Sequence, residues 1–376
     1  MPTVTRVLVA MSDTGGGHRG MSNAIAGALR NHYGDCVEVQ IEDVFALGGR
    51  SPFEVATRLY APCIRLAPWL YGWFYHILDD PRRYRRFGMV QVATRRKITT
   101  LIETFRPDVI VNTHPLANRP LLDAIEVVGR PIPVLASVSE LVTVHTSWVE
   151  PRLRLLNTAT TEAYQAVLDW GANPDRVRCV GLPVDERFSQ FSAPQPRLRS
   201  NLGLKRDLFT AMLIGGGEGA GGLGSIVDAI EETDLSIQLI VVCGRNAALK
   251  AQLESRVLRK PAYICGFVKT IPDLMHASDV IVTKGGPQTI SEALVAGRPI
   301  VLTETLPGQE EGNGAFVESR GVGFGPGKVD EVIGNLERLS NNPVVRAKMT
   351  ENAQRHGRPE AAAQVAAMVL ELAGRS

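Results

Sequence analysis

The sequence has little that would mark a secreted, membrane-spanning or nucleic-acid-binding protein. Its 376 residues include only five cysteines, scattered and without a C-x-x-C pair, which argues against a disulfide framework or zinc site and favours a reduced cytosolic compartment. No run of about 18 uncharged apolar residues is present, so we expect no membrane span. The apolar start at residues 4–10 runs directly into a polar glycine-rich loop, which does not resemble a secretory signal. The net charge of only +2 argues against a nucleic-acid partner.

What the sequence does contain is an alternation of short β-branched runs and helical stretches, the pattern of a parallel α/β sheet. In the first half we expect strands near residues 6–10, 37–41, 108–112, 133–137 and 178–180, with helices at 20–31, 53–105, 117–128 and 161–170. The second half restarts the pattern, with strands at 208–214, 237–243, 262–264, 280–283 and 299–302, and helices at 223–232, 247–258, 271–276, 289–296, 314–319, 329–339 and 344–356. Two such halves predict two Rossmann-like domains facing across a cleft.

The domain boundaries follow from composition. Three prolines and weak periodicity indicate a linker at residues 182–200, between an N-terminal domain at 1–181 and a C-terminal domain at 201–357. The alanine-rich end, 358–376, has one apolar face and predicts a last helix that could cross back to the N-terminal domain.

A glycine-rich loop, residues 12–20, joins the first strand to the first helix. Its glycines, Gly16 and Gly17 among them, let backbone N–H groups approach an anion, and a helix N-terminus favours negative charge. A tight strand-to-helix turn would have the same composition. His18 adds an imidazole at the end of a strand, a position suited to proton transfer.

A second glycine loop, residues 215–222, contains Gly216, Gly217 and Glu218 and follows the first strand of the second half. It suits either approach to a phosphate or a mobile wall of a cleft. A dinucleotide fingerprint fits poorly, because Arg245 stands in the loop after the next strand, where an acid would be needed to bind a ribose.

The third loop, residues 283–293, again leads from a strand through glycines to a helix start, where an anion would bind. We expect Glu292 in about the first turn of that helix, where it either complements the helix dipole or accepts both hydroxyls of a ribose. The following loop, 307–313, carries amides and carboxylates that suit a hydroxyl-rich ligand such as a sugar.

Several other side chains have two readings each. His114 lines the cleft or caps its loop by a hydrogen bond, and the spacing of the histidines matches no metal motif, so no metal site is predicted.

Residues 62–97 are either core helices or an interfacial segment that attaches to an anionic membrane. Its side chains of interest are Trp69 and Trp73, followed by Arg82, Arg83, Arg85 and Arg86.

Taken together, these motifs resemble those of monogalactosyldiacylglycerol synthases and their bacterial relatives. These enzymes are GT-B glycosyltransferases of the same family as the lipid II-forming N-acetylglucosaminyltransferase. The matching stretches occur in the family's order and cover nearly the whole chain: 11–19, 114–116, 181–183, 215–219, 243–246, 266–267, 283–293 and 308–313.

The resemblance implies a GT-B fold, a UDP-sugar donor (UDP-galactose or UDP-glucose), a diacylglycerol-type lipid acceptor and no metal or other cofactor. It places uracil at Gly266, Phe267 and Val268, and the ribose at Glu292. The diphosphate would lie near Gly216, Gly217, Gln288 and Thr289, and the hexose near Gln309 and Glu310. Further implied donor contacts are Gly16, Gly17, Glu218, Arg245, Gly286, Pro287 and Asn313, and the acceptor side would include His114, His145 and Trp148.

The sequence departs from the plant enzymes at three positions, of which Gln288 and Gly285 leave the hexose open between galactose and glucose. Glu140 stands where they carry Asp, Gln288 where they carry Gly, and Gly285 where they carry Ala. The implied reaction inverts the anomeric centre to give a β-glycoside. His18 is the expected general base, and Glu140 is the alternative.

Two other functions are compatible with the motifs. One is a UDP-sugar 2-epimerase-like enzyme, against which the aromatic and basic segment argues, and the other is a non-catalytic UDP-sugar or lipid-binding subunit. A lipid acceptor implies a cytoplasmic protein attached peripherally to the inner face of the cell membrane.

Overall fold

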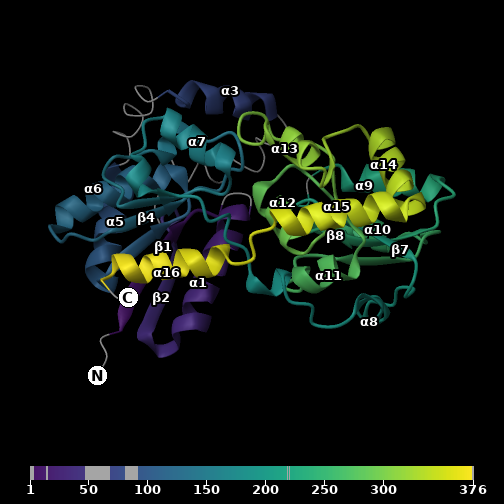
Figure 1. Cartoon of the computed structure of the whole chain (residues 1–376), viewed down its shortest axis with the longest axis horizontal. Helices are drawn as coiled ribbons and strands as arrows, with labels where there is room; N and C mark the ends of the chain where they lie inside the picture. Colours follow the sequence, from purple (N-terminus) through teal and green to yellow (C-terminus); the bar gives the residue numbers. More distant parts are fainter. Residues whose placement is uncertain are drawn as a thin grey trace. The chain divides into compact units, whose positions relative to one another are not determined.

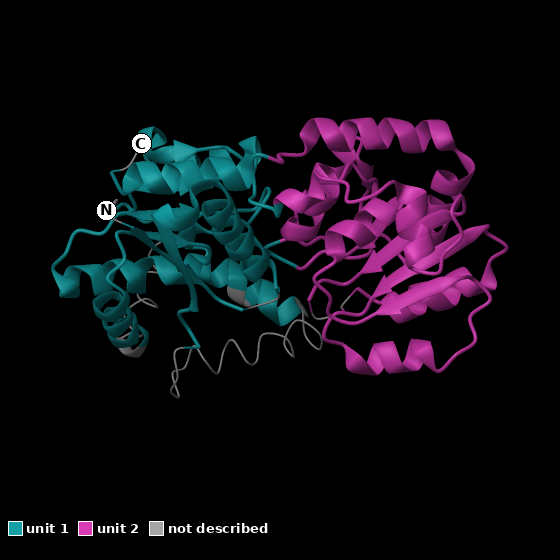
Figure 2. Cartoon of the chain, turned by 90° about the horizontal axis from the view of Figure 1, so that it is seen from below, with its two compact units in different colours: residues 1–185, 307–309, 360–376 teal, residues 186–306, 310–359 magenta. Residues whose placement is uncertain are grey.

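The computed structural model describes residues 4–13, 16–46, 68–80, 92–217, 219 and 221–374. The chain forms two compact units (Figure 2). Unit 1 comprises Met1–Asp185, Pro307–Gln309 and Glu360–Ser376, and unit 2 comprises Glu186–Leu306 and Glu310–Pro359. Each unit contains one six-stranded parallel sheet with helices around it, which confirms the predicted α/β class (Figure 1).

The sheet of unit 1 has the strand order β2-β1-β3-β4-β5-β6, and every neighbouring pair is parallel. Its strands are β1 (Thr5–Met11), β2 (Val37–Asp43), β3 (Val109–Asn112), β4 (Val134–Ser137), β5 (Leu155–Asn157) and β6 (Val177–Arg178). Its helices are α1 (Gly17–Tyr33), α3 (Pro68–Leu78), α5 (Val92–Phe105), α6 (Asn118–Val128), α7 (Thr161–Asp169) and α16 (Ala361–Leu372). The chain leaves β1 toward β2 and returns to β3 on the other side of β1, so the strand order reverses between β1 and β3. Ligands of open parallel sheets bind at such a reversal.

Helix α1 begins where the glycine loop ends. Gly16 is its N-cap, with a left-handed φ of 84° that glycine adopts at no steric cost. Met21, Ile25 and Leu29 recur at helical spacing and are fully buried. Helix α16 contacts α1 and β3, so the end of the chain belongs to unit 1 (Figure 1).

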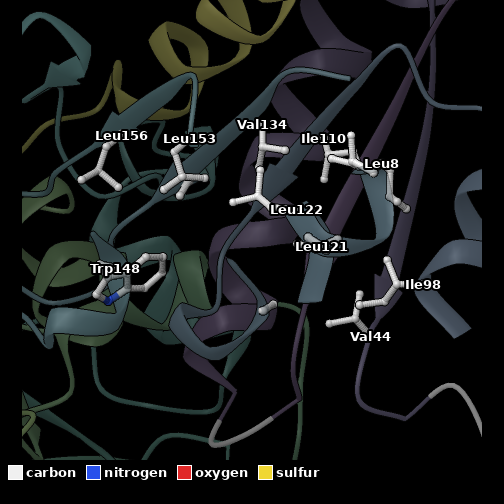
Figure 3. Packing of buried hydrophobic residues seen from close by; sticks show 14 of the residues in the cluster. Leu8, Val44, Ile98, Ile110, Leu121, Leu122, Val134, Trp148, Leu153 and Leu156 are labelled. Carbon is white, nitrogen blue, oxygen red and sulfur yellow. The ribbon is translucent and has the colours of Figure 1, made fainter. Parts of the chain in front are cut away.

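The core of unit 1 runs along one face of its sheet. Leu8, Ile110 and Val134 from three adjacent strands lie in a row, and Leu121 of α6 and Ile98 of α5 pack against this face (Figure 3). Nearly all residues of these three strands are buried, because helices cover both faces of a parallel sheet.

The sheet of unit 2 has the order β12-β11-β10-β7-β8-β9. Its strands are β7 (Phe209–Ile214), β8 (Ile237–Val242), β9 (Ala262–Cys265), β10 (Val280–Thr283), β11 (Ile300–Leu302) and β12 (Gly323–Phe324). Its helices are α8 (Gln195–Asn201), α9 (Leu223–Glu232), α10 (Ala247–Glu254), α11 (Ile271–Ala277), α12 (Pro287–Val295), α13 (Asn313–Ser319), α14 (Val329–Asn341) and α15 (Pro343–His356). The order reverses between β7 and β10, so unit 2 also has a reversal beside its first strand, although two strands, β8 and β9, lie on the far side of β7 where unit 1 has only β2 beyond β1.

The structure differs from the sequence prediction in three places. The helical region expected at 53–105 contains α3, which ends at Leu78 before the non-helical Asp79 and Asp80, and α5, which begins at Val92; residues 47–67 and 81–91 lie outside the described residues. The predicted linker at 182–200 overlaps α8, which packs on α11 in unit 2 and is held there by an Arg199–Asp279 ion pair of 2.7 Å. Strands β5 and β12 were not predicted, since they are only 3 and 2 residues long. Among the described helices, none is long and apolar enough to cross a bilayer.

Candidate functional site

His18 lies at the carboxyl edge of the unit 1 sheet, at the reversal between β1 and β3. In this register Ala10 of β1 is opposite Asn112 of β3, so the loop after β1 meets Thr113. The imidazole Nδ1 of His18 lies 2.6 Å from the Thr113 carbonyl oxygen. Because a carbonyl only accepts, Nδ1 carries the hydrogen and the lone pair lies on Nε2. Burial lowers the pKa of His18 from 6.5 to about 4, although the bond to Thr113 opposes this, so the ring is neutral at pH 7.

A second imidazole, that of His114, lies beside His18, with ring centroids 4.6 Å apart. The pKa of His114 is well below its ordinary value, first because of burial and then because of His18. Its Nδ1 has no hydrogen-bond partner among the described residues. His114 therefore lies beside His18, and both imidazoles are uncharged at pH 7.

Two asparagines that the sequence did not single out fix the loop after β3. The Asn112 side chain accepts from the His114 N–H at 3.1 Å and donates to the His114 carbonyl at 2.9 Å. It also donates to Asn118 Oδ1 at 2.6 Å, and Asn118 in turn donates to the carbonyl oxygens of Ser147 and Trp148. The only signal in the sequence was the presence of two amides in an otherwise apolar stretch.

Glu140, the alternative base, follows β4 and is 1% exposed. Its Oε2 accepts the Trp148 Nε1–H at 2.6 Å and the Ser139 hydroxyl at 3.1 Å, and its Oε1 accepts from Gln309 Nε2 at 3.4 Å. Burial raises the pKa of Glu140 to about 7, and these hydrogen bonds oppose the rise. Both carboxylate oxygens are therefore already engaged by neighbouring donors.

Trp148 and His145, which were predicted on the acceptor side, hydrogen-bond to neighbouring groups of the same region. Trp148 is fully buried, and its indole N–H serves Glu140. His145 is the N-cap of a short 3₁₀ helix, Thr146–Trp148, and its Nδ1 accepts the Ser147 backbone N–H at 3.1 Å. Its ring meets the edge of the Tyr75 ring of α3 at 4.8 Å, and burial lowers its pKa.

Helix α3 has one face against unit 1 and two tryptophans on the other. Tyr75 donates to the Thr143 carbonyl at 3.2 Å and Tyr71 to Gln309 Oε1 at 3.1 Å. Trp69 and Trp73, one turn apart, are 70% and 56% exposed. The arginines predicted to accompany them, Arg82, Arg83, Arg85 and Arg86, lie outside the described residues.

In unit 2, the predicted phosphate loops meet at the reversal between β7 and β10. Thr283 of β10 is opposite Ile214 of β7, so the loops after these two strands are neighbours. Gly244 also packs closely on the first of these loops, since a Cβ there would lie 2.8 Å from the Gly216 carbonyl oxygen and 2.6 Å from that of Gly217. Glu218 of this loop lies outside the described residues.

The predicted uracil residues lie around the ends of β8 and β9. The Arg245 guanidinium lies 5.4 Å from the centroid of the Phe267 ring, a cation–π contact, and Phe267 is largely exposed. Gly266 and Val268, on either side of this ring, are half-buried. An exposed aromatic ring beside a guanidinium suits stacking on a planar base.

Helix α12 carries the predicted diphosphate and ribose residues. Gly286 is its N-cap and Pro287 its first residue, so Gln288 and Thr289 follow in the first turn. Glu292 is the sixth residue and therefore lies in the second turn, so its expected place in the first turn is wrong. Gln288 Nε2 donates to Glu292 Oε1 at 3.0 Å, which holds this carboxylate on the side of the helix.

A buried ion pair ties the loop after β10 to the loop after β11. Lys284 Nζ lies 2.6 Å from Glu310 Oε1, and Asn313 Nδ2 donates to the Gly285 carbonyl at 2.7 Å. Glu310 and Asn313 belong to the predicted set, whereas Lys284 does not. Across the described parts of both units, no group of three or more His, Cys, Asp and Glu side chains could hold a metal ion.

Comparison with known proteins connects both units to glycosyltransferases. Residues 18–184 match the family described as monogalactosyldiacylglycerol (MGDG) synthase, and residues 214–356 match glycosyl transferases group 1. The chain is 31% identical over 366 residues to the chloroplastic MGDG synthase of Spinacia oleracea, covering 95% of this chain and 70% of that protein. It is 31% identical over 371 residues to MGDG synthase 3 of Arabidopsis thaliana, covering 95% and 79%.

Solved structures of similar fold share less sequence. MurG of Acinetobacter baumannii has a TM-score of 0.61 at 15% identity and covers 98% of this chain and 99% of that one. HepE of Anabaena, solved with UDP, has a TM-score of 0.60 at 17% identity, with coverages of 98% and 100%. A Listeria monocytogenes protein assigned as a UDP-N-acetylglucosamine 2-epimerase reaches 0.63 at 12% identity, with coverages of 98% and 96%. At these identities the likeness shows the fold alone, and that fold is common to transferases and epimerases.

Proposed function

The chain belongs to the monogalactosyldiacylglycerol synthase family and is a glycosyltransferase of GT-B fold, and from this premise we propose that it transfers a hexose, galactose or glucose, from a UDP-sugar to the hydroxyl of a diacylglycerol-type lipid. In the proposed reaction the lipid oxygen attacks the anomeric carbon while the bond to the UDP oxygen breaks. A single displacement inverts that carbon and gives a β-glycosyl lipid.

The observation that carries the proposal is the hydrogen bond of His18 to the Thr113 carbonyl. A lipid hydroxyl is a weak nucleophile, so its proton must be removed as it attacks. The Thr113 carbonyl fixes the tautomer in which Nε2 can accept this proton, and burial keeps the ring neutral beforehand. A positioned base of this kind contributes about 10²–10⁴-fold to the rate.

Glu140 has a positioning role in this proposal. Its two oxygens already accept from Trp148 and Gln309, and its raised pKa leaves a substantial protonated fraction at neutral pH. A base that must first give up these donors is the weaker candidate. Glu140 thereby fixes the Gln309 amide, which the family resemblance assigns to the hexose.

Unit 2 supplies the donor contacts. The N-terminus of α12 favours a diphosphate without a metal, because its first N–H groups lack intrahelical acceptors. Arg245 and Phe267 suit the uracil, and Glu292 suits the ribose hydroxyls. The chain would act at the cytoplasmic face of a membrane, where Trp69 and Trp73 of α3 anchor it to an anionic lipid surface.

One incubation tests this function against its alternatives. Purified protein is mixed with UDP-galactose or UDP-glucose and liposomes containing diacylglycerol, and glycolipid and UDP are measured. We expect both products in equal amounts, and none with His18→Ala. Conversion of the UDP-sugar without lipid would indicate an epimerase, and binding without turnover would indicate a non-catalytic subunit.

A further inference from the structure

Lys284 and Glu310 of unit 2 form an ion pair that is mostly removed from solvent. Their side chains are 23% and 4% exposed, and Nζ and Oε1 lie 2.6 Å apart. The other carboxylate oxygen, Oε2, accepts the Leu306 backbone N–H at 2.9 Å. Glu310 is therefore fully engaged, while the ammonium group remains partly accessible.

The ammonium group lies beside the positive end of α12. A Cβ built on Gly286, the N-cap of this helix, would be 3.6 Å from Lys284 Nζ and 3.8 Å from Glu310 Oε1. A Cβ on Gly216 would be 3.7 Å from Lys284 Cε. Two glycines thus leave space over the lysine, and the two positive groups adjoin each other.

One polar atom without a partner lies near the backbone of the same lysine. Thr303 Oγ1 is buried without a hydrogen-bond partner in the described part of the chain and lies 3.1 Å from a Cβ position built on Gly221. That position is 3.8 Å from Lys284 Cβ and 3.9 Å from the Lys284 backbone nitrogen. Buried hydroxyls normally find partners, so Thr303 Oγ1 is available to a polar ligand that enters beside Gly221.

From this arrangement we propose that Lys284 binds the diphosphate of the donor directly and that Glu310 holds the ammonium group until the nucleotide arrives. The inference rests on the proposed function and extends it to a residue outside the predicted donor set. A diphosphate brings more negative charge than one carboxylate and is also attracted by the helix end, so it competes with Glu310 for Lys284.

The same contact would assist the reaction. When the bond between the anomeric carbon and the UDP oxygen breaks, its electron pair stays on that oxygen, and a fixed ammonium group stabilises the added charge. The bond to the lipid oxygen forms at the same carbon, and His18 takes the lipid proton. A purely structural ion pair, which only joins the two loops, would have no such preference for phosphate.

Isothermal titration calorimetry with UDP, UMP and uridine distinguishes these roles. Lys284→Gln should weaken UDP binding about tenfold or more and leave uridine within about twofold, because only the phosphate contact is lost. Glu310→Gln keeps an acceptor for Leu306 but removes the competing charge, so UDP should bind several-fold more tightly. Gly286→Ala adds a methyl group at ordinary contact distance, and it should weaken UDP but not uridine.

Lys348→Gln is the matched control, because Lys348 pairs with Glu351 at 2.8 Å on an exposed helix. It should change no affinity, and thermal melting should show that each variant is folded. Equal losses for UDP and uridine in Lys284→Gln, or unchanged UDP affinity, would overturn the inference. If the wild type binds UDP but forms no glycolipid, the proposed function fails while the Lys284 result stands; if it binds no UDP, both fail.

Discussion

The two candidate bases can be separated by pH, because burial moves their pKa values in opposite directions. The pKa of His18 is lowered to about 4 and that of Glu140 is raised to about 7. If His18 is the base, it is already neutral throughout the range from about pH 5 to 8. The kcat/KM of the wild type should then lack an acid limb near 7 and decline only toward about 4. If Glu140 is the base, activity must fall below about pH 7.

Glu140→Gln is the decisive variant. Its side-chain carbonyl still accepts the Trp148 N–H, so the support of the loop remains, while ionisation is removed. We expect kcat/KM to stay within about tenfold of the wild type with an unchanged pH profile. His18→Ala should lose about a hundredfold or more, mainly in kcat, because the base acts only in the transition state.

The pH dependence of folding stability gives an independent check of the two pKa shifts, because each shift predicts the direction in which stability changes with pH. Glu140 has a folded-state pKa of about 7 against an ordinary value of 4.5, so the folded protein loses stability as pH rises through that window. The full effect is about 3 kcal/mol, and Glu140→Gln should recover part of it above pH 7. His18 has the opposite pH dependence. Its pKa is lower in the folded protein, so the folded protein loses up to about 3 kcal/mol of stability as pH falls from 6.5 to about 4.

The assay measures initial UDP release with diacylglycerol liposomes between about pH 5 and 9, with circular dichroism at each pH to exclude unfolding. Two results together would refute the assignment of His18: a wild-type kcat/KM that falls below about pH 7, and a Glu140→Gln variant that is inactive. So would His18→Ala with an unchanged kcat.

Three further predictions concern other side chains. Glu292→Ala should weaken UDP, UDP-glucose and UDP-galactose equally, by about tenfold, because the ribose is common to all three; wild-type affinity in calorimetry would leave Glu292 only its bond to Gln288. Trp148→Phe removes a donor from Glu140, so the pH midpoint of its stability effect should move above 7; an unmoved midpoint would mean that this hydrogen bond does not favour the carboxylate. Replacing Trp69 and Trp73 with Ser should reduce sedimentation with anionic vesicles without lowering Tm, because both side chains are exposed. Val344→Ser changes another exposed apolar residue and should leave sedimentation unchanged. Equal pelleting of the wild type and both variants would place the membrane contact elsewhere.

The fold was predictable because most central strands are short runs of buried apolar residues and the first strand of each unit leads into glycines. The bounds of the elements were less predictable where a strand is very short or where its pairing with a neighbouring strand decides its extent. Strand β5 is Leu155–Asn157, too short to stand out, and its place in the sheet comes from pairing with β4. Helix α3 ends at Leu78, within a stretch that the sequence analysis expected to be helical as far as Phe105.

Residue types at the site were predictable, but their partners were not. His18 was identified by its place after a strand, whereas Thr113, which fixes its tautomer, is 95 residues away and contributes only a backbone carbonyl. Lys284 stood inside a recognised motif, yet a lysine beside glycines looks like an exposed charge. Its proposed role follows from its ion pair with Glu310, which is 26 residues further along the chain.

Each unit places its proposed functional group at the reversal of its sheet, but the group in unit 1 is a neutral imidazole and the group in unit 2 is an ammonium group. A general base must be neutral before the reaction, and His18 achieves this by burial beside a carbonyl and a second neutral ring, with no carboxylate among its hydrogen bonds and ring contacts in the described residues. The proposed ligand of the leaving diphosphate must be positively charged, and the partly buried Lys284 forms an ion pair with Glu310. A carboxylate beside His18 would raise the pKa of the ring and favour its protonated form, whereas the carboxylate of Glu310 lies beside a group that is positively charged. Burial thus keeps the proposed base of unit 1 neutral, while the proposed diphosphate ligand of unit 2 lies in an ion pair, so each unit is suited to a different half of the proposed reaction.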